Sequence, residues 1–102
     1  TEIKANKMTI GFDNKQNSIL YSNQTYKLRK GDMIYLFTDG FPDQIGGPQR
    51  KKFYYPPFRE LLKSLSPLSL ETQRQQLDQA HVNWLDGRFE QTDDILIMGI
   101  RY

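Results

Sequence analysis

Three aspartates stand at the ends of two apolar runs. Asp39 follows the run of residues 33–37, and Asp93 and Asp94 directly precede a second run, residues 95–100. If the two runs are antiparallel neighbouring strands, the end of the first lies beside the start of the second and the carboxylates converge. Clustered carboxylates repel one another unless a cation compensates them, and hard oxygen donors suit magnesium, manganese or calcium. The placement predicts a divalent-metal site.

The same residues have a simpler interpretation. Asp-Gly at residues 39–40 and Asp-Asp at residues 93–94 are ordinary turn sequences, and each taken separately favours a turn over a ligand. Only their joint placement beside two apolar runs favours a metal site. From the residues alone, the metal site and a pair of turns remain alternatives.

Composition limits the chemistry. The chain has 102 residues, which fits one domain or part of one, and its 13% aromatic content predicts a packed fold. It has no cysteine and one histidine, which excludes thiolate sites and imidazole clusters. The net charge is only +2 and the basic residues are spread out, so nucleic acid is not an expected partner.

The ends and the hydropathy of the chain suggest its setting. No apolar run approaches the roughly 20 residues that cross a bilayer, and the first residues lack the layout of a signal peptide. We therefore expect a cytoplasmic location and no membrane contact by this chain, and anchoring of its parent to a membrane through other segments is an alternative that the sequence leaves open. Because it begins at Thr1 without an initiator methionine, we expect a fragment of a longer polypeptide.

The elements that position the aspartates follow from local patterns. A strand over residues 7–12 and a hairpin of residues 18–21 and 25–28 are predicted first. A turn at residues 29–32 then leads into residues 33–37, an unbroken apolar run that predicts a central strand buried on both faces.

Two helices are predicted before the last strand at residues 95–100. Pro57 begins the first, which ends near Leu65, while Ser69 caps the second and Gly87 ends it. The apolar stripe of the second helix comprises Leu70, Leu77, Ala80 and Trp84, and its solvent side largely comprises Gln73, Gln75, Gln76 and Gln79. The predicted class is α+β, an antiparallel sheet with two helices on one face.

The segments KGDMIYLFTDG (residues 30–40) and QTDDIL (residues 91–96) together resemble the carboxy-terminal motifs of the PPM-type metal-dependent protein phosphatases, in the SpoIIE-like bacterial branch. Their order, their spacing and the helices between them also fit, so the resemblance covers nearly the whole chain. It implies that residues 1–102 are the carboxy-terminal part of a single phosphatase domain whose upstream part is absent. The implied fold is part of a four-layer αββα sandwich.

The resemblance also implies roles for individual residues. Asp39 and Asp93 match metal ligands, while Asp94 and Gly40 match positions that support the metal site. The complete domain is expected to hold two manganese or magnesium ions, which activate a bridging water and position the phosphate for in-line attack. No covalent phosphoenzyme and no catalytic residue beyond the metal ligands are implied.

The implied substrate is phosphoserine or phosphothreonine on a protein, commonly a small bacterial regulator of the anti-anti-sigma type. Sensor or receiver domains are expected upstream in the parent. The family's remaining ligands lie in an upstream motif that this sequence lacks, so the fragment alone is expected to be inactive. The sequence departs from the family pattern at two places. Leu96 stands where many members have threonine, and the pair Pro42-Asp43 stands where Thr-Glu is commoner.

A cationic and aromatic segment lies between the two motifs: Arg50, Lys51, Lys52 and then residues 53–55. These cations are candidates for docking a phosphoprotein; alternatively, they are simply solvated and the aromatic residues anchor the loop to the core. We interpret His81 and Trp84 as structural residues of the second helix and Asp32 as a turn former.

A second function also fits the sequence. A non-catalytic regulatory or protein-interaction module with the same fold would bind a partner through a sheet edge or the loop around Lys51. Half of a sandwich leaves one surface uncovered, so self-association of the fragment is expected in either case.

Overall fold

A computed structural model describes residues 25–102. Its elements in chain order are β1 (Met33–Phe37), β2 (Ile45–Gly46), β3 (Lys51–Lys52), α1 (Tyr55–Leu65), α2 (Leu70–Leu85) and β4 (Ile97–Arg101). The predicted α+β class is confirmed. The strand and the first half of the hairpin predicted within residues 7–21 lie outside the described residues. The prediction of a strand at residues 25–28 is wrong, because these residues form no regular structure.

Strands β1 and β4 form an antiparallel pair, as predicted. Met33 lies opposite Arg101, and Phe37 lies opposite Ile97. Strand β4 starts two residues later than predicted because the hydroxyl of Thr38 accepts the hydrogen bond from the Leu96 amide at 3.1 Å. At Leu96, the Thr38 side chain therefore takes the place of the backbone carbonyl that a paired strand would supply.

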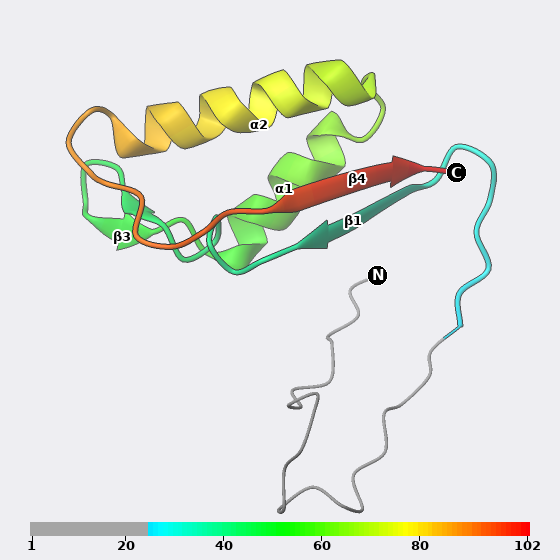
Figure 1. Cartoon of the computed structure of the whole chain (residues 1–102), viewed down its shortest axis with the longest axis horizontal. Coiled ribbons are helices and arrows are strands. Elements are labelled where there is room, and N and C mark those ends of the chain that lie inside the picture. The colour runs from blue at the N-terminus through cyan, green and yellow to red at the C-terminus, as the bar shows by residue number, and fades with distance from the viewer. Residues whose placement is uncertain (1–24) are drawn as a thin grey trace, which may run out of the picture.

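Both helices lie on the same side of the β1–β4 sheet (Figure 1). The core between the helices and the sheet consists of the buried residues Phe41, Phe58 and Leu62, and Tyr35 and Phe37 of β1 pack against it. The prediction that β1 is buried on both faces is wrong for the described residues. Leu36, on the opposite face of the strand, is 55% exposed because no described element covers that face.

Helix α1 begins two residues earlier than predicted, at Tyr55, so both following prolines lie in its first turn. Proline is tolerated there because the first amides of a helix have no partner within the helix. Helix α2 ends at Leu85, where Asp86 takes a left-handed conformation with φ of 52°. The predicted terminator, Gly87, follows with φ of 67°.

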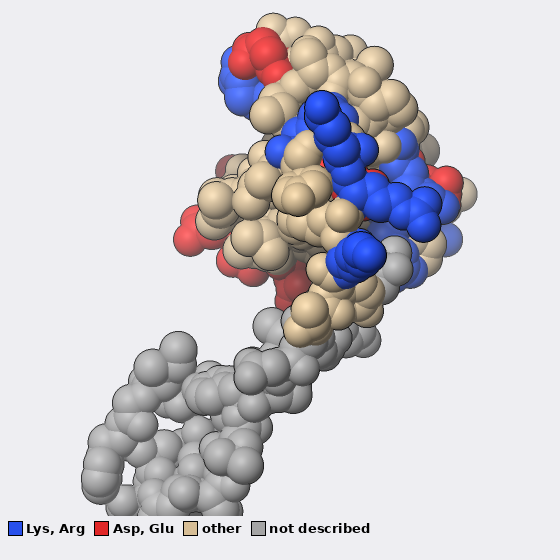
Figure 2. Space-filling model, turned by 90° about the vertical axis from the view of Figure 1, so that its right-hand side faces the viewer, with Lys and Arg blue, Asp and Glu red and all other residues tan. Residues whose placement is uncertain are grey.

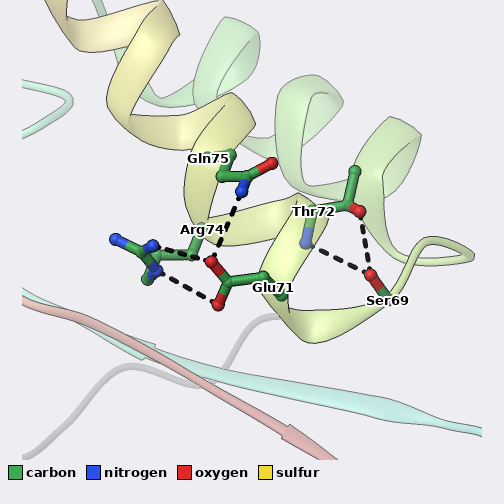
Figure 3. Close-up of polar contacts among 5 residues, drawn as sticks. All are labelled: Ser69, Glu71, Thr72, Arg74 and Gln75. Carbon is green, nitrogen blue, oxygen red and sulfur yellow. Dashed lines mark hydrogen bonds and ion pairs between the residues drawn. The ribbon is translucent and has the colours of Figure 1, made fainter.

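The start of α2 is capped as predicted (Figure 3). The Ser69 hydroxyl accepts a hydrogen bond from the Thr72 amide at 3.2 Å. In the first turn, Arg74 donates to Glu71 at 2.7 Å, and this hydrogen bond holds the pKa of the Glu71 carboxyl below its ordinary value. An acidic residue in this turn also faces the positive end of the helix dipole.

Ser69→Ala is expected to lower the free energy of unfolding by about 1 kcal/mol, because it leaves the Thr72 amide without its cap. Urea denaturation monitored by circular dichroism measures this change. Ser64→Ala is a matched control, since its hydroxyl only donates to the Leu61 carbonyl within α1. An equal loss in the two variants would contradict a specific capping role.

Gln73 corrects the predicted solvent side of α2. It is only 3% exposed, accepts a hydrogen bond from the Tyr35 hydroxyl at 2.6 Å and donates to the Leu68 carbonyl at 2.9 Å. The carbonyls in the turn between the helices need hydrogen-bond donors, and Gln73 is buried because its side chain supplies one, although a glutamine in a helix is usually exposed. Burial of the Tyr35 hydroxyl raises its pKa, although the Arg101 charge opposes the shift.

Arg101 links the end of β4 to the turn between the helices. Its guanidinium donates to the carbonyls of Ser66 at 3.0 Å and Leu68 at 2.6 Å. Lys and Arg side chains gather on this end of the molecule (Figure 2). Since β1 begins here and Asp39 follows its other end, this basic surface and the aspartates occupy opposite ends of the sheet.

Candidate functional site

The end of β1 and the approach to β4 are joined by Thr38. Its backbone amide donates to the Leu96 carbonyl at 3.0 Å, and its hydroxyl donates to the Asp94 carbonyl at 3.1 Å. The antiparallel pairing thus brings the segment of Asp39 alongside the segment of Asp93 and Asp94. This juxtaposition is the arrangement that the antiparallel hypothesis required.

Gly40 lies directly against the Asp94 backbone. A Cβ atom at this position would lie 2.2 Å from the Asp94 carbonyl oxygen, which is a backbone atom and cannot rotate away. The absence of a side chain at Gly40 therefore leaves room for the Asp94 backbone. A side chain here would push the two aspartate segments apart.

Gly40→Ala is expected to lower the free energy of unfolding by about 1–3 kcal/mol through this steric overlap. Gly99→Ala is the matched control within β4, because its added Cβ would meet the flexible end of Met33 at 3.3 Å and the Tyr35 ring at an ordinary contact distance of 3.5 Å. Thermal unfolding of both variants measures the difference. Equal stability of the two would show that the segments separate without cost.

The three carboxylates are exposed at this edge of the fold. One oxygen of Asp39 accepts a hydrogen bond from the Tyr55 hydroxyl at the start of α1. Asp93 Oδ1 accepts from the Asp94 amide at 2.8 Å, which orients the Asp93 side chain. Such hydrogen bonds fix the direction of a carboxylate, as the outer partners of metal ligands do.

The donor set at this edge of the fold meets part of the needs of a divalent metal. Exposed carboxylate oxygens are the donor type that manganese and magnesium bind, so Asp39 and Asp93 fit as a partial ligand set. Within residues 25–102, however, no group of three or more Asp, Glu, His or Cys residues is arranged to hold a metal ion. A two-metal centre would need ligands from outside this part of the chain.

The segment between Asp39 and α1 folds into the short β2–β3 hairpin. Ile45 pairs with Lys52 and Gly46 pairs with Lys51. Arg50 has a φ of 53° in the connecting turn. All three cations, Arg50, Lys51 and Lys52, are exposed.

The hairpin is fastened to the core by an aromatic residue, as one of the two interpretations expected. The ring centroid of Phe53 lies 5.0 Å from that of Phe41 and 5.3 Å from that of Trp84. Lys52 lies 3.7 Å from the Asp43 carboxylate, an exposed ion pair that contributes little to stability. The cations are thus presented to solvent from an anchored hairpin that leads directly into Tyr55.

The second helix supports this hairpin. Trp84 lies against Gly46 and Gly47, where any Cβ atom would overlap its indole ring, and its Nε1 donates to the Gln44 carbonyl at 2.7 Å. His81 lies beside Phe41 with ring centroids 5.8 Å apart. These contacts agree with structural roles for both residues.

Two residues of the candidate site, Tyr55 and Gln44, are not predicted by the sequence patterns. Tyr55 contacts Asp39 across sixteen residues of sequence, and Gln44 is a buried amide within a segment that contains several glycines and prolines. An aromatic residue just before two prolines is a weak signal for the first. Nothing in the sequence distinguishes Gln44 from the exposed glutamines.

Comparison with known proteins identifies the family. The family model described as Stage II sporulation protein E (SpoIIE) matches residues 1–102. The chain belongs to the SpoIIE family. Among solved structures, the SpoIIE-family chain resembles the SiaA-PP2C domain of Pseudomonas aeruginosa, with 30% sequence identity and a TM-score of 0.77.

The match to the SiaA-PP2C domain covers 83% of this SpoIIE-family chain and 34% of that domain. No curated protein matches the sequence. The resemblance to SpoIIE-like PPM-type phosphatases is therefore confirmed, and the α+β fold corresponds to part of a PP2C domain. Among the described residues, neither helix has the length and apolar character needed to span a membrane.

Proposed function

We propose that this chain contributes Asp39 and Asp93 to the metal centre of a protein phosphatase that hydrolyses phosphoserine or phosphothreonine. The observation that carries the proposal is the close approach of Gly40 to the Asp94 backbone, which puts the two aspartate segments side by side. When bound, manganese or magnesium would supply an activated water and offset the charge of the phosphate. The chain's own part is to hold two of the carboxylates at one edge.

We further propose that the hairpin cations assist substrate binding. Arg50, Lys51 and Lys52 are exposed on a hairpin that leads into Tyr55, the residue in contact with Asp39. Exposed cations attract a phosphorylated or acidic protein over roughly a Debye length, about 8 Å at physiological salt. The expected partner is a phosphorylated bacterial regulator of the anti-anti-sigma type, with sensor or receiver domains elsewhere in a cytoplasmic or membrane-anchored parent.

Phosphatase activity of the full-length protein tests the proposal. A phosphothreonine peptide and the generic ester p-nitrophenyl phosphate serve as probes, each with manganese or with EDTA. We expect turnover only with metal, and none from residues 1–102 alone. Full activity in EDTA, or no activity and no manganese binding in the full-length protein, would contradict it.

A non-catalytic interaction module is the second candidate. It is favoured by the exposed apolar side chains on the sheet face that no element of residues 25–102 covers: Leu36, Met98 and Ile100. Such a face promotes association with another surface. Sedimentation of the isolated chain is expected to show self-association, and partner binding without metal-dependent turnover in the full-length protein would favour this second function.

A further inference from the structure

The side chain of Gln44 connects two segments that are far apart in the sequence. It is 1% exposed, and its Nε2 donates to the carbonyls of Ile45 at 3.0 Å and Glu90 at 2.9 Å. Its Oε1 accepts a hydrogen bond from the Thr92 amide at 3.4 Å. One buried amide thus holds both a carbonyl and an amide of the segment that leads directly into Asp93.

The backbone of Gln44 is held equally firmly. Its carbonyl accepts from Trp84 Nε1 at 2.7 Å and from the Phe53 amide at 3.0 Å, and its amide donates to the Phe41 carbonyl at 3.1 Å. Gln44 is therefore fixed by α2 and by the exit of the hairpin. Because its own position is fixed, it is able to impose a position on residues 90–92.

The segment before Asp93 has few other constraints. Residues 89–96 form no helix or strand, and residues 90–94 are exposed. The Gln91 side chain donates to the Asp93 carbonyl at 2.9 Å, but this bond is local to the segment and does not tie it to the rest of the fold. After Asp93, the Thr38 hydroxyl holds the Asp94 carbonyl. Before Asp93, the described hydrogen bonds that attach residues 90–92 to the loop after Asp39 come from Gln44.

We propose that Gln44 is a positioning residue that sets the Asp93 carboxylate beside Asp39 by clamping residues 90–92. The inference rests on the proposed function, because it takes Asp93 to be a metal ligand. Gln44 acts on Asp93 through the backbone of residues 90–92, which precede Asp93, whereas Thr38 holds the backbone that follows it. With the segment clamped on both sides, the direction of Asp93 is set before any metal binds.

Gln73 provides a matched control. It is also a buried glutamine with a hydrogen-bonded amide, but it joins α2 to Tyr35 and Leu68, away from the aspartates. Methionine has nearly the length of glutamine and lacks its strong donor and acceptor. Gln44→Met and Gln73→Met therefore remove comparable buried polar contacts, of which only one set touches the segment before Asp93.

The experiment uses the full-length protein and two readouts. Amide hydrogen exchange without metal measures the ordering of residues 90–94, and calorimetric titration with manganese measures affinity. Gln44→Met is expected to speed exchange in residues 90–94 and weaken manganese binding by about 10-fold or more, the loss typical of an outer partner. Gln73→Met is expected to lower Tm similarly while leaving both readouts unchanged.

Unchanged exchange in residues 90–94 and unchanged affinity in Gln44→Met would overturn the inference while leaving the phosphatase proposal standing. Equal loss of affinity in Gln73→Met would also overturn it, because it would reveal a general effect of stability. A wild-type protein that binds no manganese would remove the proposed function and this inference together. If Gln44→Met fails to fold, Gln44→Glu, which keeps the acceptor but loses both donated bonds, is expected to give the same two changes.

Discussion

Replacing either Asp39 or Asp93 with asparagine in the full-length protein is expected to weaken manganese binding by more than about 100-fold, since loss of an outer partner alone costs 10–100-fold. Asparagine keeps the size of the side chain but removes the negative charge that offsets the cation. Metal-dependent hydrolysis of the phosphothreonine peptide should be lost in parallel. Calorimetry and a phosphate-release assay measure the two effects.

Asp32→Asn is the control for these variants. Asp32 lies before β1, at the opposite end of the sheet, where its carboxylate accepts a hydrogen bond from the Arg29 amide at 2.9 Å. Its replacement should leave both metal affinity and turnover unchanged. If Asp39→Asn and Asp93→Asn behave like Asp32→Asn, these aspartates belong to turns and the metal assignment is wrong.

Phe58→Ala is expected to produce the largest loss of stability, about 3–5 kcal/mol. Phe58 is fully buried, and its ring centroid lies 5.0 Å from that of Phe37 on β1 and 5.1 Å from that of Phe41 after Asp39. Alanine would leave a cavity where helix α1, the strand and the following loop meet. Urea unfolding measures the change in free energy.

The effect of Phe58→Ala should also reach the aspartates, because Phe37 and Phe41 flank Asp39 in the sequence. Val82→Ala, at an exposed position on α2, is the control and should change stability by less than about 0.5 kcal/mol. Equal effects of the two substitutions would mean that Phe58 is not part of a cooperative core.

Local patterns were sufficient for most elements of the fold. The apolar run of residues 33–37 corresponds to β1 because a short unbroken run matches the length of a strand. Ser69 was identifiable as a cap because its role depends on a backbone amide only three residues away. In both cases the decisive contact is local or follows a simple period.

Non-local requirements account for the errors. Gln73 is buried because of a tyrosine in another element and the carbonyls of a turn, neither of which a helical period records. Leu36 is exposed because both described helices lie on the other face, whereas an apolar run by itself suggests cover on both sides. Such outcomes depend on how separate elements meet.

The candidate site likewise has features that the sequence predicts and features that depend on contacts between separate elements. The neighbouring positions of the Asp39 and Asp93 segments were predictable, because pairing two antiparallel strands places the residues after one strand beside the residues before the other. The contact of Tyr55 with Asp39 depends on the angle at which α1 leaves the hairpin, and this angle is not encoded by residue spacing. The ligand roles of the aspartates remain predictions.

The pairing of β1 with β4 has a consequence for biosynthesis. Among the described residues, Met33 pairs with Arg101, and the hairpin and both helices lie between these two residues in the chain. During translation β1 must wait for this partner until residues 97–101 have left the ribosome, because contacts between distant residues form late. A nascent chain stalled before that point would hold Asp39 without Asp93 beside it, so the two aspartates come together only after the intervening segment has been synthesised.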